Sequence, residues 1–261
     1  MPIPSHLLLL AAGRAAPPAP PVSGVSMWYD ASYAPSITAS SGAVSQWNDL
    51  SGNAHHLTQT SSNRPTTGTR AINGVNAIDF DGTDDHMVTS TGPNITAMTI
   101  FIVMQQDVTA PASQGLLTLL PGSQTANDLN GVMVELRTNK YALAWGEGST
   151  SSSAGDYVAQ HQTSGTADTA DHLIRVAADS SARTHHVDNA ATTLTTFSSS
   201  GTTTFLSGLG STQLLLRIGC RGSVTYPYDG LVGEVLIYPS VLSGGDITTV
   251  ESYLKTKWGT P

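Results

Sequence analysis

The segment Leu231-Val-Gly-Glu-Val-Leu-Ile-Tyr238 decides the fold, because apolar residues fill most of a stretch as long as one β-strand. A short apolar run of this kind is expected of a strand that is covered on both faces. Two other segments have the same character, Thr99-Ile-Phe-Ile-Val-Met104 and Leu214-Leu-Leu-Arg-Ile218. The three segments therefore predict central strands of a sheet.

Outward from these runs, shorter segments alternate with turns. Two hairpins are predicted, one from Val132–Leu136 with Tyr141–Trp145 and one from Leu173–Ala177 with Thr184–Val187. Stretches rich in Ser, Thr, Asn and Gly separate the apolar runs and predict surface loops at residues 58–69, 124–130, 148–155 and 198–204. No repeat of fixed period is present, which disfavours a propeller or a solenoid.

One helix is predicted near the C-terminus. Ser243 is suited to the N-cap, with Asp246 three residues later near the positive end of the helix, and Gly259 is suited to its end. Apolar residues recur at helical spacing, namely Ile247, Val250 and Leu254. We expect this helix to lie across the end of a sandwich and to bury Leu254 and Trp258.

The charge of the chain excludes two classes of partner. Eleven basic residues stand against nineteen acidic ones, which gives a formal net charge of −8. No cluster of Lys or Arg is present, so the chain lacks the basic footprint that nucleic acid requires. An anionic membrane surface would repel it as well.

The remaining composition fits a sheet protein of one domain. Only 11% of the 261 residues are charged, and small or β-compatible residues take their place. A β-sandwich of this length commonly forms a single domain. Cys220 is the only cysteine, so no intrachain disulfide can form, and we expect it to be a buried structural thiol.

Residues 1–24 differ from the rest of the chain. They contain a short apolar run, Leu7, Leu8, Leu9 and Leu10, followed by a Pro-rich stretch that predicts an extended tether. The apolar run has no preceding Lys or Arg and is short for a signal peptide, and it is far too short to span a bilayer. We expect residues 1–24 to be a docking arm and linker, and residues 25–261 to be the folded domain. The alternative is that the leucines pack on the chain's own sandwich.

Five regions of the sequence, in the correct order, resemble motifs of one known superfamily. They are Trp28–Ser32, Trp47–Asn53, Ile78–His86, Asp171–Val176 with His186–Asn189, and Gly230–Ser243. They resemble the laminin-G-like members of the concanavalin A-like lectin/glucanase superfamily, as found in phage virion proteins and bacterial surface proteins. Three positions depart from the family pattern: His86 replaces an aromatic residue, Asp171 replaces Trp and Asn189 replaces Gly. The resemblance covers about residues 25–259.

The resemblance implies a fold but no particular activity. The expected fold is all-β, a two-sheet antiparallel jelly-roll sandwich with one short C-terminal helix and an extended N-terminal arm. The same fold serves lectins, hydrolases and purely structural modules. Function therefore has to be inferred from the side chains.

The side chains do not predict an enzyme. Hydrolases of this superfamily use acidic residues at alternate positions of one strand, and none of the four glutamates has a carboxylate two positions away. In the closing strand, the resemblance gives Glu234 a structural role. No G-x-S-x-G motif is present. The adjacent pairs His55-His56 and His185-His186 point to opposite faces of a strand and do not predict a metal site.

Two kinds of binding site remain as candidates. Asp81, Asp84 and Asp85 lie in one turn and are a weak candidate for a Ca²⁺ site, although Asp81 and its neighbours would equally serve to bind the backbone of the turn. Aromatic residues near polar ones are candidate glycan-binding residues, namely Tyr226, Tyr228 and Asp229 in a predicted loop, with Trp145 and Tyr157 elsewhere. Each of these aromatic residues would equally cap a loop or contact a partner chain.

These observations favour a non-catalytic virion protein of a tailed bacteriophage. In this hypothesis the arm docks onto other virion proteins, and the domain, present in multiple copies as a minor tail or tail-tip component, meets a host-surface glycan on the particle surface. One alternative is a capsid or tail decoration protein that acts only through protein contacts. Another is a carbohydrate-binding module of a secreted bacterial protein.

Overall fold

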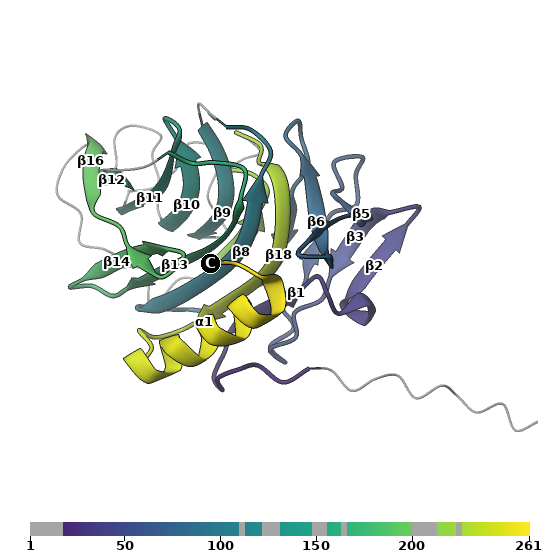
Figure 1. Ribbon diagram of the computed structural model, residues 1–261, viewed down its shortest axis with the longest axis horizontal. Helices are drawn as coiled ribbons and strands as arrows, with labels where there is room; N and C mark the ends of the chain where they lie inside the picture. Colours follow the sequence, from purple (N-terminus) through teal and green to yellow (C-terminus); the bar gives the residue numbers. More distant parts are fainter. Residues whose placement is uncertain are drawn as a thin grey trace, which may run out of the picture.

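The computed structural model describes residues 18–109, 113–121, 131–147, 156–162, 166–199, 213–222 and 226–261. Within these residues, antiparallel strands form two packed layers, with a helix on the outside of one of them (Figure 1). The fold is thus the all-β sandwich that the sequence predicts. The leucines of the predicted docking arm, Leu7–Leu10, lie outside the described residues.

The first sheet is built around β18 (Asp229–Tyr238). One edge of β18 pairs with β8 along almost its whole length, and the other edge pairs with β6 at its start and β1 at its end. Beyond β8 the sheet continues through β13, β14 and β15. The bounds of these strands are β1 Met27–Asp30, β6 Val75–Asp81, β8 Met98–Gln106, β13 Asp171–Ala178, β14 Arg183–Val187 and β15 Ala190–Ala191.

The second sheet faces the first and contains the predicted hairpin of β10 and β11. Its strands pair in the order β4, β7, β17, β9, β10, β11, β12 and β16. Their bounds are β4 Leu57–Thr58, β7 Met87–Thr89, β9 Ser113–Pro121, β10 Gly131–Arg137, β11 Lys140–Glu147, β12 Asp156–Gln162, β16 Leu194–Ser199 and β17 Leu214–Ile218.

Three further strands join the two sheets along one side. They are β2 (Ile37–Ser40), β3 (Ala43–Trp47) and β5 (Thr66–Ile72), and a single 3-10 turn at Ala34–Ser36 precedes β2. Strand β3 pairs with β4 of the second sheet and touches β5, which in turn pairs with β6 of the first sheet. On the opposite side, no described residue of β15 pairs with β16, so the sandwich is open there.

The apolar runs read from the sequence form the core between the layers. Every residue of Met98–Met104 in β8 is buried, as expected for a central strand, and so are Trp28 and Trp47 of the family-like motifs. Cys220 is fully buried, as predicted. Burial of apolar surface on this scale is the dominant stabilising term of such a domain.

The predicted helix is α1 (Gly244–Trp258), with both predicted caps. The hydroxyl oxygen of Ser243 accepts a hydrogen bond from the Asp246 amide at 3.2 Å, and Gly259 ends the helix with a φ of 70°. Leu254 and Trp258 are buried, as expected. The helix lies on the outer face of the first sheet, across β13 and β18, and not across the end of the sandwich (Figure 1).

Three loop predictions need correction. Ser198 and Ser199 of the predicted loop 198–204 are the last residues of β16, where they pair with β12, and Thr58 of the predicted loop 58–69 ends β4. Residues 66–69 of the predicted loop 58–69 belong to β5, because the β6 edge offers backbone partners that the polar sequence does not reveal. Asp229, which the sequence predicts in a loop, is the first residue of β18. Among the described residues, no helix is both long enough and apolar enough to cross a lipid bilayer.

Candidate functional site

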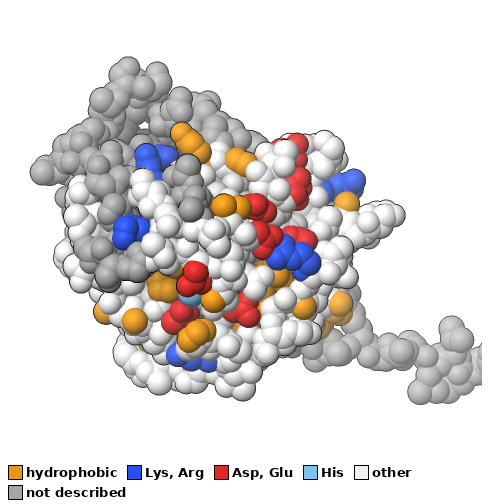
Figure 2. Space-filling model, turned by 45° about the horizontal axis from the view of Figure 1, so that its top comes forward, with side chains coloured by type: hydrophobic (Ala, Val, Ile, Leu, Met, Phe, Trp, Pro, Cys, Tyr) orange, Lys and Arg blue, Asp and Glu red, His pale blue; other side chains and the backbone are white. Residues whose placement is uncertain are grey.

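An acidic pocket of about 310 Å³ lies where β6, β8 and β18 meet at one end of the first sheet. Six of its lining residues are aspartates: Asp79, Asp81, Asp84, Asp85, Asp107 and Asp229. Ser62, Arg64 and Thr66 contribute hydrogen-bond donors to its wall. In the space-filling view, acidic side chains gather next to basic ones on the face that is turned forward (Figure 2). We call these residues the acidic pocket.

Strand register brings the carboxylates together. Asp229, the first residue of β18, lies opposite Asp81, the last residue of β6. On its other side, the backbone oxygen of Asp229 accepts a hydrogen bond of 3.0 Å from the amide of Asp107, which follows β8. Asp79 and Asp81 are two positions apart on β6 and therefore share one face of the strand. Four carboxylates thus come from three neighbouring strand ends.

The turn after β6 is organised by Asp81. Its Oδ1 accepts hydrogen bonds from the amides of Thr83, Asp84 and Asp85, at 2.9 to 3.4 Å. The Oδ2 of Asp85 accepts in return from the Asp81 amide at 3.1 Å. Four backbone donors of this turn therefore have a carboxylate partner, and the Gly82 amide donates to the Tyr228 backbone oxygen at 3.1 Å instead. This is a structural use of these side chains.

The same turn shifts the pKa values of two carboxyl groups, Asp81 and Asp85, in opposite directions. Partial burial alone would raise the pKa of Asp81, but the amides that donate to it bring its pKa below the usual value. Burial, and then the negative charge of Asp81, raise the pKa of Asp85 to about 6. Burial and the charge of Asp107 also raise the pKa of Asp229. Ionising Asp85 and Asp229 is therefore unfavourable, and a ligand that donates hydrogen bonds or carries positive charge would favour it.

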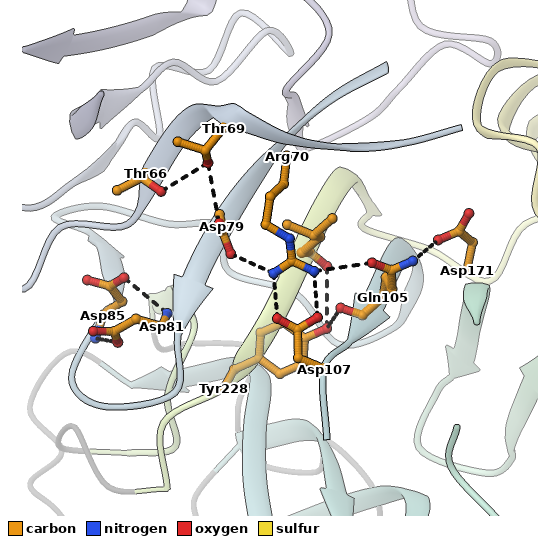
Figure 3. Close-up of polar contacts among 11 residues, drawn as sticks. Thr66, Thr69, Arg70, Asp79, Asp81, Asp85, Gln105, Asp107, Asp171 and Tyr228 are labelled. Atoms are coloured by element: carbon orange, nitrogen blue, oxygen red, sulfur yellow. Dashed lines mark hydrogen bonds and ion pairs between the residues drawn. The ribbon is translucent and has the colours of Figure 1, made fainter. Parts of the chain in front are cut away.

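Arg70 neutralises part of this charge from the neighbouring strand β5. Its guanidinium makes two hydrogen bonds to the carboxylate of Asp107, one of them at 2.6 Å, and another of 3.0 Å to Asp79 (Figure 3). It also donates to Gln105, whose amide donates to Asp171 on β13 at 2.7 Å. A polar row thus crosses the first sheet from β5 to β13 and fixes one wall of the pocket.

Three carboxylates of the pocket have the spacing of metal ligands. One oxygen each from Asp81, Asp84 and Asp85 lies within 4.8 Å of the others. These are the residues that the sequence offers for Ca²⁺, and Ca²⁺ takes six to eight oxygens. The backbone amides already occupy one oxygen of Asp81 and one of Asp85. The geometry supports the structural role of this turn, and Ca²⁺ binding stays a prediction.

The predicted glycan-binding residues do not form one site. Asp229 lines the acidic pocket, but Tyr228 is fully buried: its ring packs against Phe80 and its hydroxyl donates to the Gln105 backbone at 2.8 Å. Tyr228 is thus part of the core and offers no surface to a sugar. Tyr226 is 49% exposed, with the Arg221 guanidinium 5.5 Å from its ring centroid.

The other two aromatic candidates lie on the second sheet. The ring of Trp145 on β11 is only 2% exposed and is covered by the Arg183 guanidinium, at 4.1 Å from the ring centroid. It is therefore closed to a stacking sugar. Tyr157 belongs to β12 and pairs with Gly146, but its side chain lies outside the described part of the chain.

The sequence does not predict six of the lining residues, namely Ser62, Arg64, Thr66, Asp79, Phe80 and Asp107. It does not predict Arg70 either, which pairs with Asp79 and Asp107. One signal was present, because Asp79 and Asp81 have the alternate spacing that places carboxylates on one face of a strand. None of the four glutamates has this spacing. Asp107 and Arg70 carry no local signal, since only the register of β5, β6, β18 and β8 brings them together.

Comparisons with known proteins support the fold. No protein-family model matches the sequence, and no curated protein matches it. Among solved structures, the chain is similar to Trypanosoma rangeli sialidase in complex with the inhibitor DANA, with a TM-score of 0.57 and 14% identity over 89% of this chain. The match covers 33% of the sialidase chain, so this chain spans about a third of its length.

A second similar structure is the binding domain of botulinum neurotoxin serotype G. Its TM-score is 0.54 at 7% identity, over 91% of this chain and 54% of that one. A looser match, with a TM-score of 0.44, is the CBM40 domain of Ruminococcus gnavus IT-sialidase, at 14% identity over 60% of this chain and 84% of that one. Identities this low show the class of fold only. The chain is a β-sandwich in architecture.

Proposed function

We propose that this chain is a carbohydrate-binding β-sandwich domain that holds a glycan in the acidic pocket without cleaving it. The observation that carries the proposal is the convergence of six aspartates with Ser62, Arg64 and Thr66 around one cavity of about 310 Å³. Ionised carboxylates are pure acceptors, so they suit ligands that are rich in hydroxyl or amine donors. A hydroxyl-rich or amine-bearing sugar satisfies this requirement.

The similar structures agree with this proposal at the level of architecture. Trypanosoma rangeli sialidase is known in complex with sialic acid, and this structure matches the chain with a TM-score of 0.52 at 15% identity. The fold is thus compatible with sugar recognition, while the pocket supplies the specific argument. Aromatic stacking plays no part in the proposal, because Tyr228 is buried and Trp145 is covered by Arg183.

One observation favours hydrolysis as a second candidate function. Asp81 and Asp85 offer oxygens within 4.8 Å of each other, and the pKa of Asp85 is raised to about 6 while that of Asp81 is lowered. Carboxyl pairs with divergent pKa values are typical of glycosidases. Against catalysis, Asp85 is only 6% exposed and both side chains bind the backbone of their own turn.

The finer hypothesis of a phage tail protein stays a prediction. It depends on the docking arm at Leu7–Leu10, which lies outside the described residues, and none of the three similar structures described above is a virion protein. A carbohydrate-binding module of a secreted protein needs the same pocket and no arm. The comparisons therefore support sugar binding, and they do not favour one location of the protein over another.

The test is binding of the full chain to a glycan array, followed by titration calorimetry with the best neutral or amine-bearing glycan. We expect Asp84→Asn and Asp229→Asn to weaken that binding at least tenfold, because each removes a charged acceptor. Asp179→Asn is the matched control, since Asp179 caps the exposed β13–β14 turn away from the pocket. Unchanged affinity in both pocket variants would refute the proposal. If the chain hydrolyses aryl glycosides and Asp85→Asn abolishes this activity, the result would favour hydrolysis.

A further inference from the structure

An exposed aromatic ring, that of Tyr226, lies close to the acidic pocket along the chain. Among the described residues, three large apolar side chains are exposed, namely Val108, Tyr226 and Val241, and only Tyr226 carries a ring. It precedes Asp229, which lines the pocket, by three positions. Three residues of extended chain span at most about 11 Å, which limits the separation of these two Cα atoms. Tyr226 is therefore near enough to contact a ligand that extends out of the pocket.

The backbone around Tyr226 is fixed by hydrogen bonds on both sides of Pro227. The Gly115 amide of β9 donates to the Tyr226 oxygen at 2.7 Å, and the Tyr228 amide donates to the Gly219 oxygen at 2.8 Å. The side chain of Tyr228 is fully buried in the core, and the ring of Pro227 fixes its own φ. The position of Tyr226 relative to the pocket is thus set before any ligand binds.

Tyr226 also has a backbone conformation that a residue with a side chain rarely adopts. Its φ is 54°, in the left-handed region. Residues held in this region are strained, and they persist where the surrounding structure fixes them, often at binding sites. Here the strained backbone presents the ring at the surface, where the exposed fraction of Tyr226 is 49%, two positions before the fully buried Tyr228.

Arg221 holds the ring of Tyr226 from one side. The central carbon of its guanidinium lies 5.5 Å from the ring centroid, which is a cation–π contact. Arg221 also forms an ion pair of 3.8 Å with Glu135 on β10, whose side chain is buried. Salt and solvent screen a buried pair only weakly, so the guanidinium is kept in place. One face of the ring is occupied in this way, and the exposed part of Tyr226 is available to a ligand.

We propose that Tyr226 is a second subsite of the glycan site, where its ring stacks against the sugar unit next to the one in the acidic pocket. Tyrosine suits this role because its ring is large, rigid and amphipathic, so a contact with it costs little conformational entropy. The inference rests on the proposed function, since it places the end of the same glycan in the pocket. It specifies the class of ligand, which is an oligosaccharide and not a monosaccharide.

The experiment is calorimetric titration of the full chain with D-glucosamine and with the chitosan dimer. Both probes carry the amine that suits the acidic pocket, and they differ in the second sugar unit. We expect the dimer to bind about fivefold more tightly than glucosamine, which is the strength of one stacking contact. In NMR spectra, the dimer should shift the ring resonances of Tyr226, and glucosamine should leave them in place.

Four variants locate the contact. Tyr226→Ala should reduce dimer affinity to that of glucosamine, while Tyr226→Phe, which keeps the ring and the same backbone strain, should retain it. Val241→Ala is the matched control, because Val241 has a similar exposed fraction of 46% and lies just before α1. It should change the affinity for neither probe. Asp229→Asn should weaken the binding of both probes.

The outcomes separate this inference from the proposed function. If Tyr226→Ala leaves dimer affinity unchanged, or if glucosamine binds as tightly as the dimer, the inference is wrong, and a loss of binding in Asp229→Asn would still support the pocket. If Asp229→Asn leaves the affinity for both probes unchanged, the proposed function fails and the inference fails with it. A chain that binds neither probe would also refute the inference, whereas the glycan array would still decide the proposed function.

Discussion

Lys257 on α1 and Glu234 on β18 form an ion pair in which Nζ lies 2.7 Å from Oε2. The same ammonium group lies 2.7 Å from the carboxylate of Asp30 on β1. Glu234 also accepts hydrogen bonds from both Trp28 and Trp258 at 2.7 Å and from Tyr253 at 3.0 Å. Glu234 therefore helps to fix the helix to the sheet, which is the structural role expected for this residue.

Replacing Lys257 should weaken the fold strongly. Lys257→Met leaves the buried carboxylates of Asp30 and Glu234 without their shared cation, and we expect the free energy of unfolding to fall by about 3 kcal/mol. Urea denaturation measures the change. Lys255→Met, two residues earlier on the same helix and outside this cluster, is the control. A loss of equal size in the control would mean that helix propensity, and not the ion pair, is responsible.

Asp85 should make the protein less stable at neutral pH than at acidic pH. The folded state raises its pKa from 3.8 to about 6, so the penalty for ionising it grows as the pH rises from about 4 to 6 and is complete above that. Asp85→Asn keeps an acceptor for the Asp81 amide without the charge. We expect its melting temperature to exceed that of the wild type at pH 7.5 and to match it at pH 4. A gain that is the same at both pH values would contradict this assignment.

His172 should have the opposite dependence. Burial alone would lower its pKa, but hydrogen bonds from its ring to Asp188 at 2.7 Å and Asp168 at 3.0 Å raise it above 6.5. The stability that it provides is therefore complete below pH 6.5 and is lost as the pH rises through the raised value. We expect His172→Gln to destabilise the protein more at pH 6 than at pH 9. Melting curves at both pH values, with an NMR titration of the ring, provide the measurement.

Gly82 should be irreplaceable in the acidic pocket. Its φ is 69°, and a Cβ atom there would lie 2.7 Å from Cβ of Asp229. Gly74 has a φ of 74° but no atom within 4 Å of the same position. We expect Gly74→Ala to lower stability by about 1 kcal/mol, through backbone strain alone, and Gly82→Ala to lower it further and to displace Asp229. Equal effects of the two substitutions would show that the close approach is unimportant.

Calcium should have little effect on stability. The turn at Asp81 already uses its carboxylates to bind four backbone amides, which a metal ion would have to share. A ligand at a hundred times its Kd would stabilise the folded state by about 2.7 kcal/mol. Because we expect no such binding, the melting temperature should differ by less than 2 °C between millimolar Ca²⁺ and excess chelator. A rise of several degrees with Ca²⁺, lost in Asp84→Asn, would instead establish the metal site.

The predictable parts of this structure are those with local causes. The apolar run at Leu231–Tyr238 and the caps at Ser243 and Gly259 are sufficient to place β18 and α1, because strand burial and helix termination depend on neighbouring residues. Tyr228 shows the limit of such reasoning. A tyrosine between Pro227 and Asp229 suggests a surface loop, yet packing against Phe80 places it in the core.

The candidate site depends on contacts that are distant in sequence. Arg70 reaches Asp107 across 37 positions, and it does so from a strand whose polar composition predicts a loop. Arg70 lies within an irregularity in the pairing of β5 with β6, between Thr67 and Ala71. No pattern within a short window of sequence encodes such a register, so the acidic pocket could be predicted only in part.

The position of β18 has a consequence for how this chain reaches its native state. This strand is near the C-terminus, yet it is the centre of the first sheet and pairs with strands that start as early as Met27. On the ribosome, β1 and one edge each of β6 and β8 must therefore wait for this partner until residues 229–238 emerge. Domains dominated by such distant pairings fold slowly. A stop codon before β18 would release a polypeptide with its central gap unfilled, a natural target for chaperones and proteases.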